Sequence, residues 1–322
     1  MGTWRRAILA IVAFGLAASV AKMLSSYSAD IREARVRIAS GAQIADTACG
    51  PIQYAIAGEG APVLVIHGAG GGFDQGLDIG APLVRAGMQV IAVSRFGYLG
   101  TPLPRDASPA AQARAHACLL DALGIRSATV LGASAGATSA MQFAILFPDR
   151  VRALVLLVPA AYAPRPDGAP SVETPAGVPL LFDTALRSDF VFWAALRAAP
   201  DFMTRAILGT PPEVVQAADA GEQARVARTL EHLLPVMPRR LGLVNDAAVT
   251  SSLEPYPLEK ILVPTLLVSA RDDLYGTAAA ARYAAQRIPN ASLVLYSSGG
   301  HLLVGHEREE AAEMRAFLSA RS

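Results

Sequence analysis

Short, continuous apolar runs recur along most of the chain, and each ends at a turn rich in glycine or polar residues. The runs are 63–66, 89–93, 128–131, 154–157, 264–270 and 292–296. An uninterrupted apolar run of this length is typical of a strand buried on both faces of a parallel sheet. Helical patterns separate several of the runs, over 108–123, 277–287 and 307–318. The alternation predicts an α/β fold, with a mostly parallel central sheet and helices on both of its faces.

The alternation stops between residues 160 and 253, where Pro-rich turns and helical patterns replace the strands. The clearest helices there are 189–198 and 222–234. Ligands of open α/β sheets bind outside the carboxyl ends of the strands, so we expect this insertion to form a helical cap over them. The predicted parts are a first core segment, 45–159, the cap, 160–253, and a second core segment, 254–322.

The N-terminal segment, residues 1–24, is a separate hydrophobic element. Arg5 and Arg6 precede an uncharged run, 7–21, that approaches the length of a membrane span. We expect a membrane anchor, with a signal segment cleaved at Ser19-Val20-Ala21 as the alternative and a buried soluble helix as the third reading. Either of the first two would place the predicted α/β domain in the periplasm or outside the cell, anchored or secreted. The polar stretch 25–44 predicts a linker with a short helix, and an irregular β pattern over 45–57 predicts an edge hairpin.

Composition narrows the class of protein. The 322 residues are 52% hydrophobic and 17% charged, with a formal net charge of +1. This length fits one large α/β domain with an insertion, or two small domains. Near-neutral charge without basic blocks argues against a nucleic-acid partner. The two cysteines, Cys49 and Cys118, lack metal-binding spacing. Cys118 falls in an apolar helical pattern and is expected in the core, with a disulfide in an oxidising compartment as the less favoured alternative.

The segment Gly132-Ala133-Ser134-Ala135-Gly136 follows one apolar run and precedes an Ala-rich helical pattern. It is a G-x-S-x-G pattern in the strand–turn–helix context of a nucleophile elbow. The glycines are explained by a turn so sharp that side chains two residues from the serine would collide. Such a turn would raise the Ser134 hydroxyl above the sheet. The alternative is a helix start that needs small residues for packing alone.

A glycine-rich loop, His67-Gly68-Ala69-Gly70, follows the run 63–66. It lacks the lysine and hydroxyl of a phosphate-binding P-loop, and no G-x-G-x-x-G continues into a helix. The backbone amides of Ala69 and Ala135 are predicted instead to bind the oxyanion of a tetrahedral intermediate. His67 is expected to make a structural hydrogen bond rather than act as a base. The residues expected to contact the substrate are Gly70, Phe73 and Tyr98.

Two later turns supply candidates for an acid and a base. Arg271-Asp272-Asp273 follows the run 264–270, and Gly299-Gly300-His301 follows the run 292–296. The register of the first turn favours Asp273 as the acid that faces the histidine, with Asp272 holding the turn. Asp246, in the connection from the cap to the core, is expected to cap a helix or a turn.

Two histidines lie near the last of these turns. His301 follows two glycines, which let the backbone bend the ring back over the strand ends toward Ser134. His306 precedes the charged helix start Glu307-Arg308-Glu309-Glu310 and is expected at an exposed helix entry. His301 is therefore the predicted base.

Together these motifs resemble the capped α/β-hydrolase fold family that contains esterases, C–C bond hydrolases and proline iminopeptidases. The likeness covers about residues 50–318 and shares the family's chain order of serine, acid and histidine. Two positions depart from the family pattern. Ala270 stands where the family often has glycine, and Ser94-Arg95 where it often has aspartate. Because the second of these loops shapes the pocket mouth, the substrate of a relative does not transfer to this chain.

The resemblance implies acyl transfer at Ser134, with Asp273 and His301 completing the triad and with no metal or organic cofactor. The expected partners are a small-molecule acyl substrate with an apolar part and, through the N-terminal segment, a membrane. An ester or thioester hydrolase is the first hypothesis. A C–C bond or amide hydrolase with the same triad is the second, since only the pocket would differ. A slow-turnover ligand-binding or receptor-like protein is the third.

Overall fold

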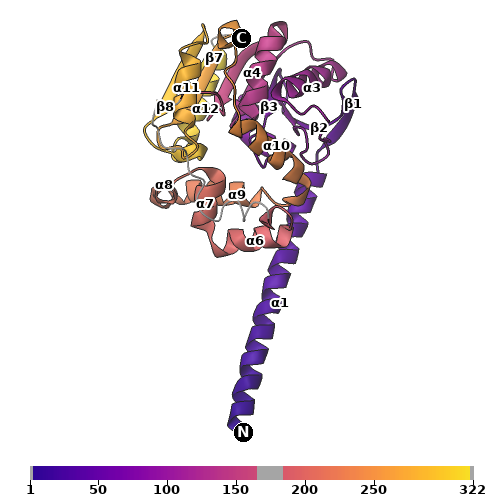
Figure 1. Ribbon diagram of the computed structural model, residues 1–322, viewed down its shortest axis with the longest axis vertical. Helices are drawn as coiled ribbons and strands as arrows, with labels where there is room; N and C mark the ends of the chain where they lie inside the picture. Colours follow the sequence, from indigo (N-terminus) through magenta and orange to yellow (C-terminus); the bar gives the residue numbers. More distant parts are fainter. Residues whose placement is uncertain (1–2, 165–183, 320–322) are drawn as a thin grey trace.

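The computed structural model describes residues 3–164 and 184–319, and eight strands there form one sheet in the order β1-β2-β4-β3-β5-β6-β7-β8 (Figure 1). The strands are β1 Gln43–Thr47, β2 Gly50–Ala57, β3 Ala61–Ile66, β4 Met88–Val93, β5 Ala128–Ala133, β6 Val151–Leu157, β7 Thr265–Ala270 and β8 Ala291–Tyr296. β1 pairs with β2 and β2 with β4 in antiparallel fashion, whereas the remaining pairs are parallel. The predicted fold class, the six apolar strands and the edge hairpin are confirmed.

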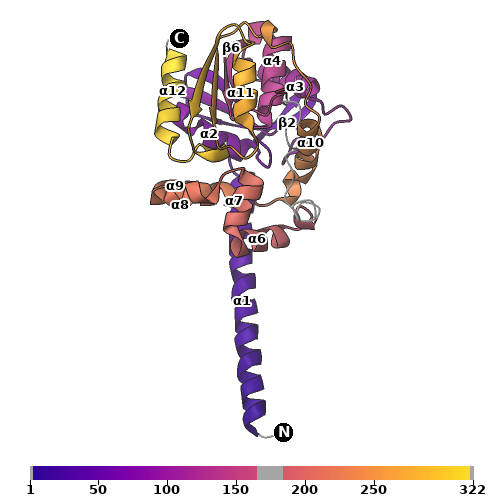
Figure 2. The ribbon, with the colours of Figure 1, turned by 60° about the vertical axis from the view of Figure 1, so that its left-hand side comes forward.

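Helices cover both faces of the sheet (Figures 1 and 2). They are α2 Phe73–Arg85 and α12 Glu307–Ser319 on one face, and α3 Pro109–Ala122, α4 Gly136–Leu146 and α11 Thr277–Ala285 on the other. The start of α3 illustrates how the sequence sets a boundary. Ser108 caps it by accepting a hydrogen bond from the Ala111 amide at 3.2 Å, and Pro109 occupies its first turn. The strands β3 to β8 share one direction, so the loops after them meet at one edge of the sheet.

The described part of the insertion between β6 and β7 is helical. It contains α6 Asp189–Ala198, α7 Pro200–Leu208, α8 Pro212–Ala217, α9 Ala220–Glu231 and α10 Arg240–Ser251. The predicted helix 189–198 is confirmed as α6, and the helix predicted over 222–234 begins and ends slightly earlier, as α9. Residues 165–183 of the predicted cap lie outside the described residues. The cap has an apolar cluster of its own, with Phe192, Trp193 and Met203 among its buried members.

One helix, α1, runs without a break from Thr3 to Ala39. The linker expected over 25–44 is therefore wrong for most of its length. The physical reason is packing: Ile31 and Ala34 are 6% and 2% exposed and belong to the apolar cluster of the cap. By length and composition α1 could cross a membrane, since its apolar N-terminal portion has a mean hydropathy of 2.2 and no buried residues. Figures 1 and 2 show this portion projecting away from the rest of the chain.

Cys49 and Cys118 form a disulfide, with Cα atoms 6.0 Å apart. It joins the turn of the β1–β2 hairpin to α3. The expectation that Cys118 is an unpaired core residue is therefore wrong. The apolar pattern of α3 was no guide here, because it predicts burial and carries no information about a residue 69 positions away.

Candidate active site

Ser134 lies in the sharp turn between β5 and α4. Its φ is 49°, a left-handed conformation that is rare for a residue with a side chain, and its amide donates to the carbonyl oxygen of Leu157 at 2.9 Å. A Cβ atom on Gly136 would lie 2.5 Å from two carbonyl oxygens at the end of β3, and one on Gly132 would lie 2.6 Å from the Cβ of Ala140. The two glycines of the elbow are therefore needed for close approach, as predicted.

The side chains of three strand ends form one hydrogen-bonded chain. Ser134 Oγ lies 2.8 Å from Nε2 of His301, and Nδ1 of His301 lies 2.8 Å from Oδ2 of Asp273. The His301 side chain is 9% exposed, and that of Asp273 is fully buried. The structure thus brings together the three residues that the sequence indicated as nucleophile, base and acid.

The Asp273 carboxylate is held by its own turn. Oδ1 accepts the amide of Tyr275 at 2.8 Å, and Oδ2 accepts the hydroxyl of Thr277. The ring of Tyr275 also packs edge-on against that of His301, with centroids 4.9 Å apart. These contacts fix the carboxylate and the imidazole relative to each other.

The neighbouring candidates, Asp272 and His306, have other partners. Asp272 accepts the amides of Gly299 and Gly300 at 3.1 and 2.8 Å, so it holds the loop before His301 rather than its own turn. His306 lies at the entry to α12, where Nδ1 is 2.7 Å from Oε2 of Glu309. Its side chain is 23% exposed.

The two predicted oxyanion donors come from two segments next to Ser134. Ala69 is exposed in the loop after β3, and Ala135 follows the serine directly. Within residues 3–164 and 184–319, neither backbone amide has a hydrogen-bond partner. Gly68, next to Ala69, is close enough to the serine that a Cβ on it would lie 3.1 Å from the Cβ of Ser134. The loop and the elbow are therefore adjacent.

The three residues predicted to contact the substrate are buried and make structural contacts. Phe73 is 1% exposed and packs in the apolar core under α2. Tyr98 is fully buried, and its hydroxyl accepts the amide of Gly70 at 3.2 Å and donates to Oδ2 of Asp246 at 2.5 Å. The Gly70 amide is thus already engaged. Substrate contact by Gly70, Phe73 and Tyr98 therefore stays a prediction.

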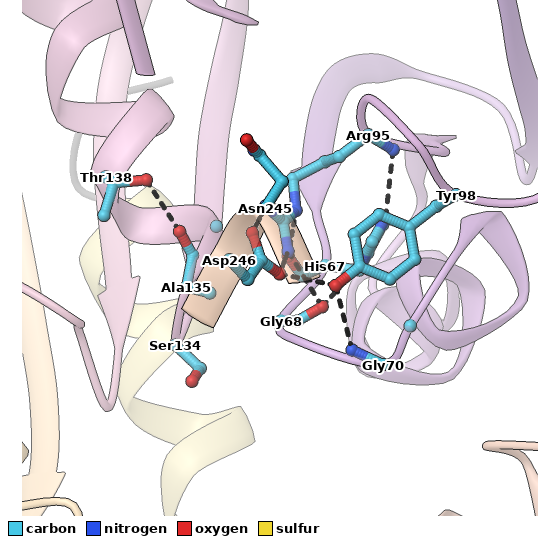
Figure 3. Close-up of polar contacts among 12 residues, drawn as sticks. His67, Gly68, Gly70, Arg95, Tyr98, Ser134, Ala135, Thr138, Asn245 and Asp246 are labelled. Atoms are coloured by element: carbon cyan, nitrogen blue, oxygen red, sulfur yellow. Dashed lines mark hydrogen bonds and ion pairs between the residues drawn. The ribbon is translucent and has the colours of Figure 1, made fainter. Parts of the chain in front are cut away.

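Asp246 does not cap a helix or a turn, so that expectation is wrong. It lies on α10 and forms a bidentate pair with Arg95, whose Nη1 and Nη2 are 2.7 and 2.5 Å from the two carboxylate oxygens (Figure 3). The two side chains are 6% and 7% exposed. Burial disfavours the charged form of Arg95, but the Asp246 carboxylate outweighs it and raises the pKa of the guanidinium. The only signal in the sequence was the arginine at the position where aspartate is common.

His67 makes structural hydrogen bonds, as predicted. Its Nε2 accepts the Arg95 amide at 3.0 Å, and its Nδ1 lies 2.7 Å from the carbonyl oxygen of Gly68. This pattern requires a proton on Nδ1 and a neutral ring. Burial and the positive charge of Arg95 lower the pKa of His67 well below its usual value, which agrees with a neutral ring.

No group of three or more His, Cys, Asp or Glu side chains in the described part of the chain is arranged to hold a metal ion. The buried polar residues of the site are instead paired with one another or with backbone. The arrangement can therefore exchange a proton between a serine and a histidine beside two amides that have no partner among the described residues.

Comparison with known proteins identifies the class. A family model described as the alpha/beta hydrolase fold matches residues 61–306. The chain therefore belongs to the α/β-hydrolase fold family. It is a hydrolase, as are relatives that match most of its length.

Two such relatives and one solved structure show the extent of the likeness. The chain is 28% identical over 261 residues to 2-hydroxy-6-oxo-6-phenylhexa-2,4-dienoate hydrolase from Comamonas testosteroni, covering 78% of this chain and 84% of the relative. It is 30% identical over 252 residues to 2-hydroxymuconate semialdehyde hydrolase from Pseudomonas putida, covering 76% and 82%. An alpha/beta hydrolase fold protein from Nakamurella multipartita superposes with a TM-score of 0.72 at 31% identity, covering 87% of this chain and 100% of that one.

Proposed function

We propose that this protein is a serine hydrolase that cleaves a carboxylic ester or thioester through an acyl-enzyme. The observation that carries the proposal is the hydrogen-bonded chain from Ser134 through His301 to Asp273. Its three members come from the ends of β5, β8 and β7, and two amides that have no partner in the described part of the chain lie beside the serine. A nucleophile, a base, an oriented acid and an oxyanion site are the parts that acyl transfer needs.

In the proposed mechanism, Nε2 of His301 accepts the hydroxyl proton while Ser134 Oγ attacks the carbonyl carbon. The Ala69 and Ala135 amides donate to the oxyanion, and Asp273 stabilises the imidazolium through Nδ1–H. The imidazolium then gives its proton to the leaving oxygen or sulfur, and the acyl-enzyme remains. A water molecule, deprotonated by His301, attacks the acyl carbon and releases the acid.

An ester makes the smallest demand on this site, because an alcohol leaves once His301 has protonated its oxygen. Cap residues suit an apolar part of the substrate. A Cβ on Gly70 would lie 2.7 and 3.7 Å from methyl groups of Leu233 and Leu243, so these side chains adjoin the oxyanion loop. We therefore propose a small acyl compound with an apolar portion as the substrate.

A C–C bond hydrolase is the second candidate, with an amide hydrolase as a variant of it. The observation that favours it is the name of the relatives from Comamonas testosteroni and Pseudomonas putida given above. The same triad serves either reaction. Turnover of a short-chain p-nitrophenyl ester, compared with turnover of a panel of C–C and amide substrates, distinguishes them.

The nucleophile is tested by labelling with a fluorophosphonate. Ser134→Ala should abolish covalent labelling and ester turnover while the fold is retained. Ser298→Ala, which alters an exposed serine near the His301 loop, is the matched control and should label normally. Labelling of the Ser134→Ala protein at another serine would refute the assignment.

We further propose that α1 anchors the protein in a membrane through about residues 7–24, with the catalytic domain in the periplasm or outside the cell. The Cys49–Cys118 disulfide supports this side of the membrane, because disulfides persist in oxidising compartments. Secretion after signal cleavage is the alternative, and the mass of the mature chain distinguishes the two. Alkylation of both cysteines in intact cells without a reductant would contradict the proposed location.

A further inference from the structure

The segment 67–71, within the loop between β3 and α2, has few contacts of its own that fix its shape. Three of its five residues are glycine and one is alanine. Glycine loses more conformational freedom on ordering than any other residue, so a loop of this composition depends mainly on partners outside it to hold one shape. We call it the oxyanion loop, since it carries Ala69.

Two buried guanidinium groups hold the carbonyl oxygens of the oxyanion loop. Arg95 donates from Nε to the oxygen of His67 at 2.9 Å and from Nη2 to that of Gly68 at 3.1 Å. Arg239 donates from Nη1 to the oxygen of Gly71 at 2.6 Å. The first arginine comes from the loop after β4 and the second from the cap. The oxyanion loop is therefore held from two sides.

The backbone amides of residues 68–71 also make hydrogen bonds, with one exception among the described residues. The contacts are Gly68 to Oε1 of Gln75 at 2.9 Å, Gly70 to the hydroxyl of Tyr98 at 3.2 Å and Gly71 to the oxygen of Gly68 at 3.3 Å. Figure 3 shows Gly70 reaching Tyr98, which in turn reaches Asp246. Of the amides of residues 68–71, only that of Ala69 is without a partner among the described residues. Among residues 3–164 and 184–319, the network thus leaves the Ala69 amide, next to Ser134, without a partner.

Each arginine is neutralised by a carboxylate from the opposite part of the chain. Arg95 of the core pairs with Asp246 of the cap, and Arg239 of the cap pairs with Asp74 at the start of α2, at 3.0 and 2.6 Å. Asp74 also lies 3.4 Å from Nε of Arg37 on α1. Arg239 and Asp74 are 0% and 4% exposed. Each ion pair has one member in the core and one in the cap. Neither arginine therefore keeps its carboxylate unless the cap is packed on the core.

We propose that Arg95 and Arg239 are positioning residues that hold the Ala69 amide as an oxyanion donor, each set in place by a carboxylate from across the boundary between core and cap. The proposal rests on the proposed function of Ser134. A donor aimed in advance at developing charge needs no reorganisation during the reaction, and the loss of one such donor lowers kcat by about 10²–10³-fold. The two arginines fix the orientation of the Ala69 amide, which the glycine-rich loop does not fix by itself.

Arg95→Lys tests the proposal in the full-length protein. Lysine keeps the positive charge beside Asp246, but a single ammonium cannot reach the carboxylate and both carbonyl oxygens in one plane. We expect kcat for a p-nitrophenyl ester to fall about 10–100-fold with KM within about threefold. Affinity for a boronic acid, which forms a tetrahedral adduct, should fall by the same factor.

Arg150→Lys is the matched control. Arg150 holds the carbonyl oxygens of Arg126 and Ile125 at 2.6 and 3.1 Å and pairs with Asp121 at 2.7 Å, the same kind of grip at the amino end of β6. The Arg150→Lys variant should keep the wild-type kcat and the wild-type affinity for the boronic acid. A merely structural role for Arg95 would change stability alone and would not move the inhibitor affinity with kcat.

The outcomes separate this proposal from the proposed function. If Ser134 is labelled and Arg95→Lys folds with unchanged kcat, or loses kcat without losing boronic acid affinity, the positioning role is refuted and the function stands. If wild-type Ser134 is not labelled, the function itself is refuted. Should Arg95→Lys fail to fold, Arg239→Lys and the isosteric Asp246→Asn are measured in the same way. Unfolding of all three would refute the proposal in favour of a purely structural role.

Discussion

Two loops meet at Ser134, and the cap holds them with different kinds of contact. The oxyanion loop after β3 is held by guanidinium pairs that are almost completely buried. The loop over residues 299–306, which carries His301 and which we call the histidine loop, is held by Glu222 and Arg225 of α9. Their side chains are 10% and 23% exposed. The ion pairs that hold the oxyanion loop lie in the interior, and the pair that holds the histidine loop borders on solvent.

The cap contacts the backbone of the histidine loop at Leu302 and at Gly305. Arg225 donates to the Leu302 carbonyl at 3.0 Å, and Glu222 accepts the Gly305 amide at 2.7 Å. The Leu302 amide donates to the hydroxyl of Thr210 at 3.2 Å. The cap thus supports both loops, but only the histidine loop is supported by a pair that salt can screen. We infer that the oxyanion loop is the rigid half of the site and the histidine loop the half that responds to conditions.

The largest expected effect separates the two carboxylates under the histidine loop. Asp273 contacts the His301 ring, whereas Asp272 contacts only backbone amides. Asp273→Asn should lower kcat by about 10³–10⁴-fold, because an amide does not hold the required imidazole tautomer. Asp272→Asn keeps one acceptor oxygen and should cost about tenfold or less. Steady-state kinetics on one ester measures both, and a larger loss for Asp272→Asn would mean that the acid is assigned one residue too late.

The two ion pairs, Arg239–Asp74 and Arg225–Glu222, should also differ in their contribution to the free energy of unfolding and in its salt dependence. Arg239→Ala leaves Asp74 buried beside only the more distant Arg37 and should cost about 3–5 kcal/mol of unfolding free energy. Arg225→Ala breaks a partly exposed pair and should cost about 1 kcal/mol. At about 1 M NaCl the loss of unfolding free energy in Arg225→Ala should become smaller, whereas the loss in Arg239→Ala should not change. Denaturant unfolding of both variants at low and high salt provides the measurement, and equal salt dependence would contradict the comparison.

A smaller effect concerns pH. Burial, and then the charges of Glu307 and Glu222, raise the pKa of Glu310 from 4.5 to about 7. The folded state therefore keeps a proton that the unfolded state releases, so this group's stabilising contribution is full below pH 4.5 and is lost as the pH rises to about 7. Glu310→Gln mimics the protonated form and should flatten that slope. Glu313→Gln, an exposed change on the same helix, should not, and an identical slope in wild type and Glu310→Gln would rule the effect out.

Much of the fold could be predicted, because buried parallel strands have an unmistakable apolar pattern. Helix α2 could not, since Gly76, Gly80 and Pro82 suggest turns. The structure explains the glycines: a Cβ on Gly76 would lie 2.9 Å from the Cβ of Ala92, and one on Gly80 would lie 2.7 Å from Val90. They permit close packing of α2 on β4, a tertiary reason that no local pattern contains.

The candidate site divides in the same way. Ser134, Asp273 and His301 each follow a recognisable strand, so their convergence could be expected from the order of the elements. The partners that fix the oxyanion loop could not, because Arg95 and Asp246 are 151 residues apart and pair only when α10 packs on the core. For the same reason the continuous α1 was not predicted, and the disulfide was only the less favoured alternative. Local sequence patterns identify residues at strand ends. Pairs of residues that are far apart in the sequence can be recognised only once the fold is known.

The central claim, that His301 is the base for Ser134, is tested most directly by the pH dependence of kcat/KM in His301→Ala and His306→Ala. The ring of His306 stacks on Tyr296 with centroids 3.9 Å apart and contacts Glu309, away from the serine. A base must be unprotonated to accept the serine proton, so wild-type activity should fall on the acidic side. His301→Ala should lose about 10³-fold or more in kcat/KM and the acidic limb with it, while His306→Ala stays within about threefold of wild type and keeps that limb. The reverse result, with the large loss in His306→Ala, would contradict the account.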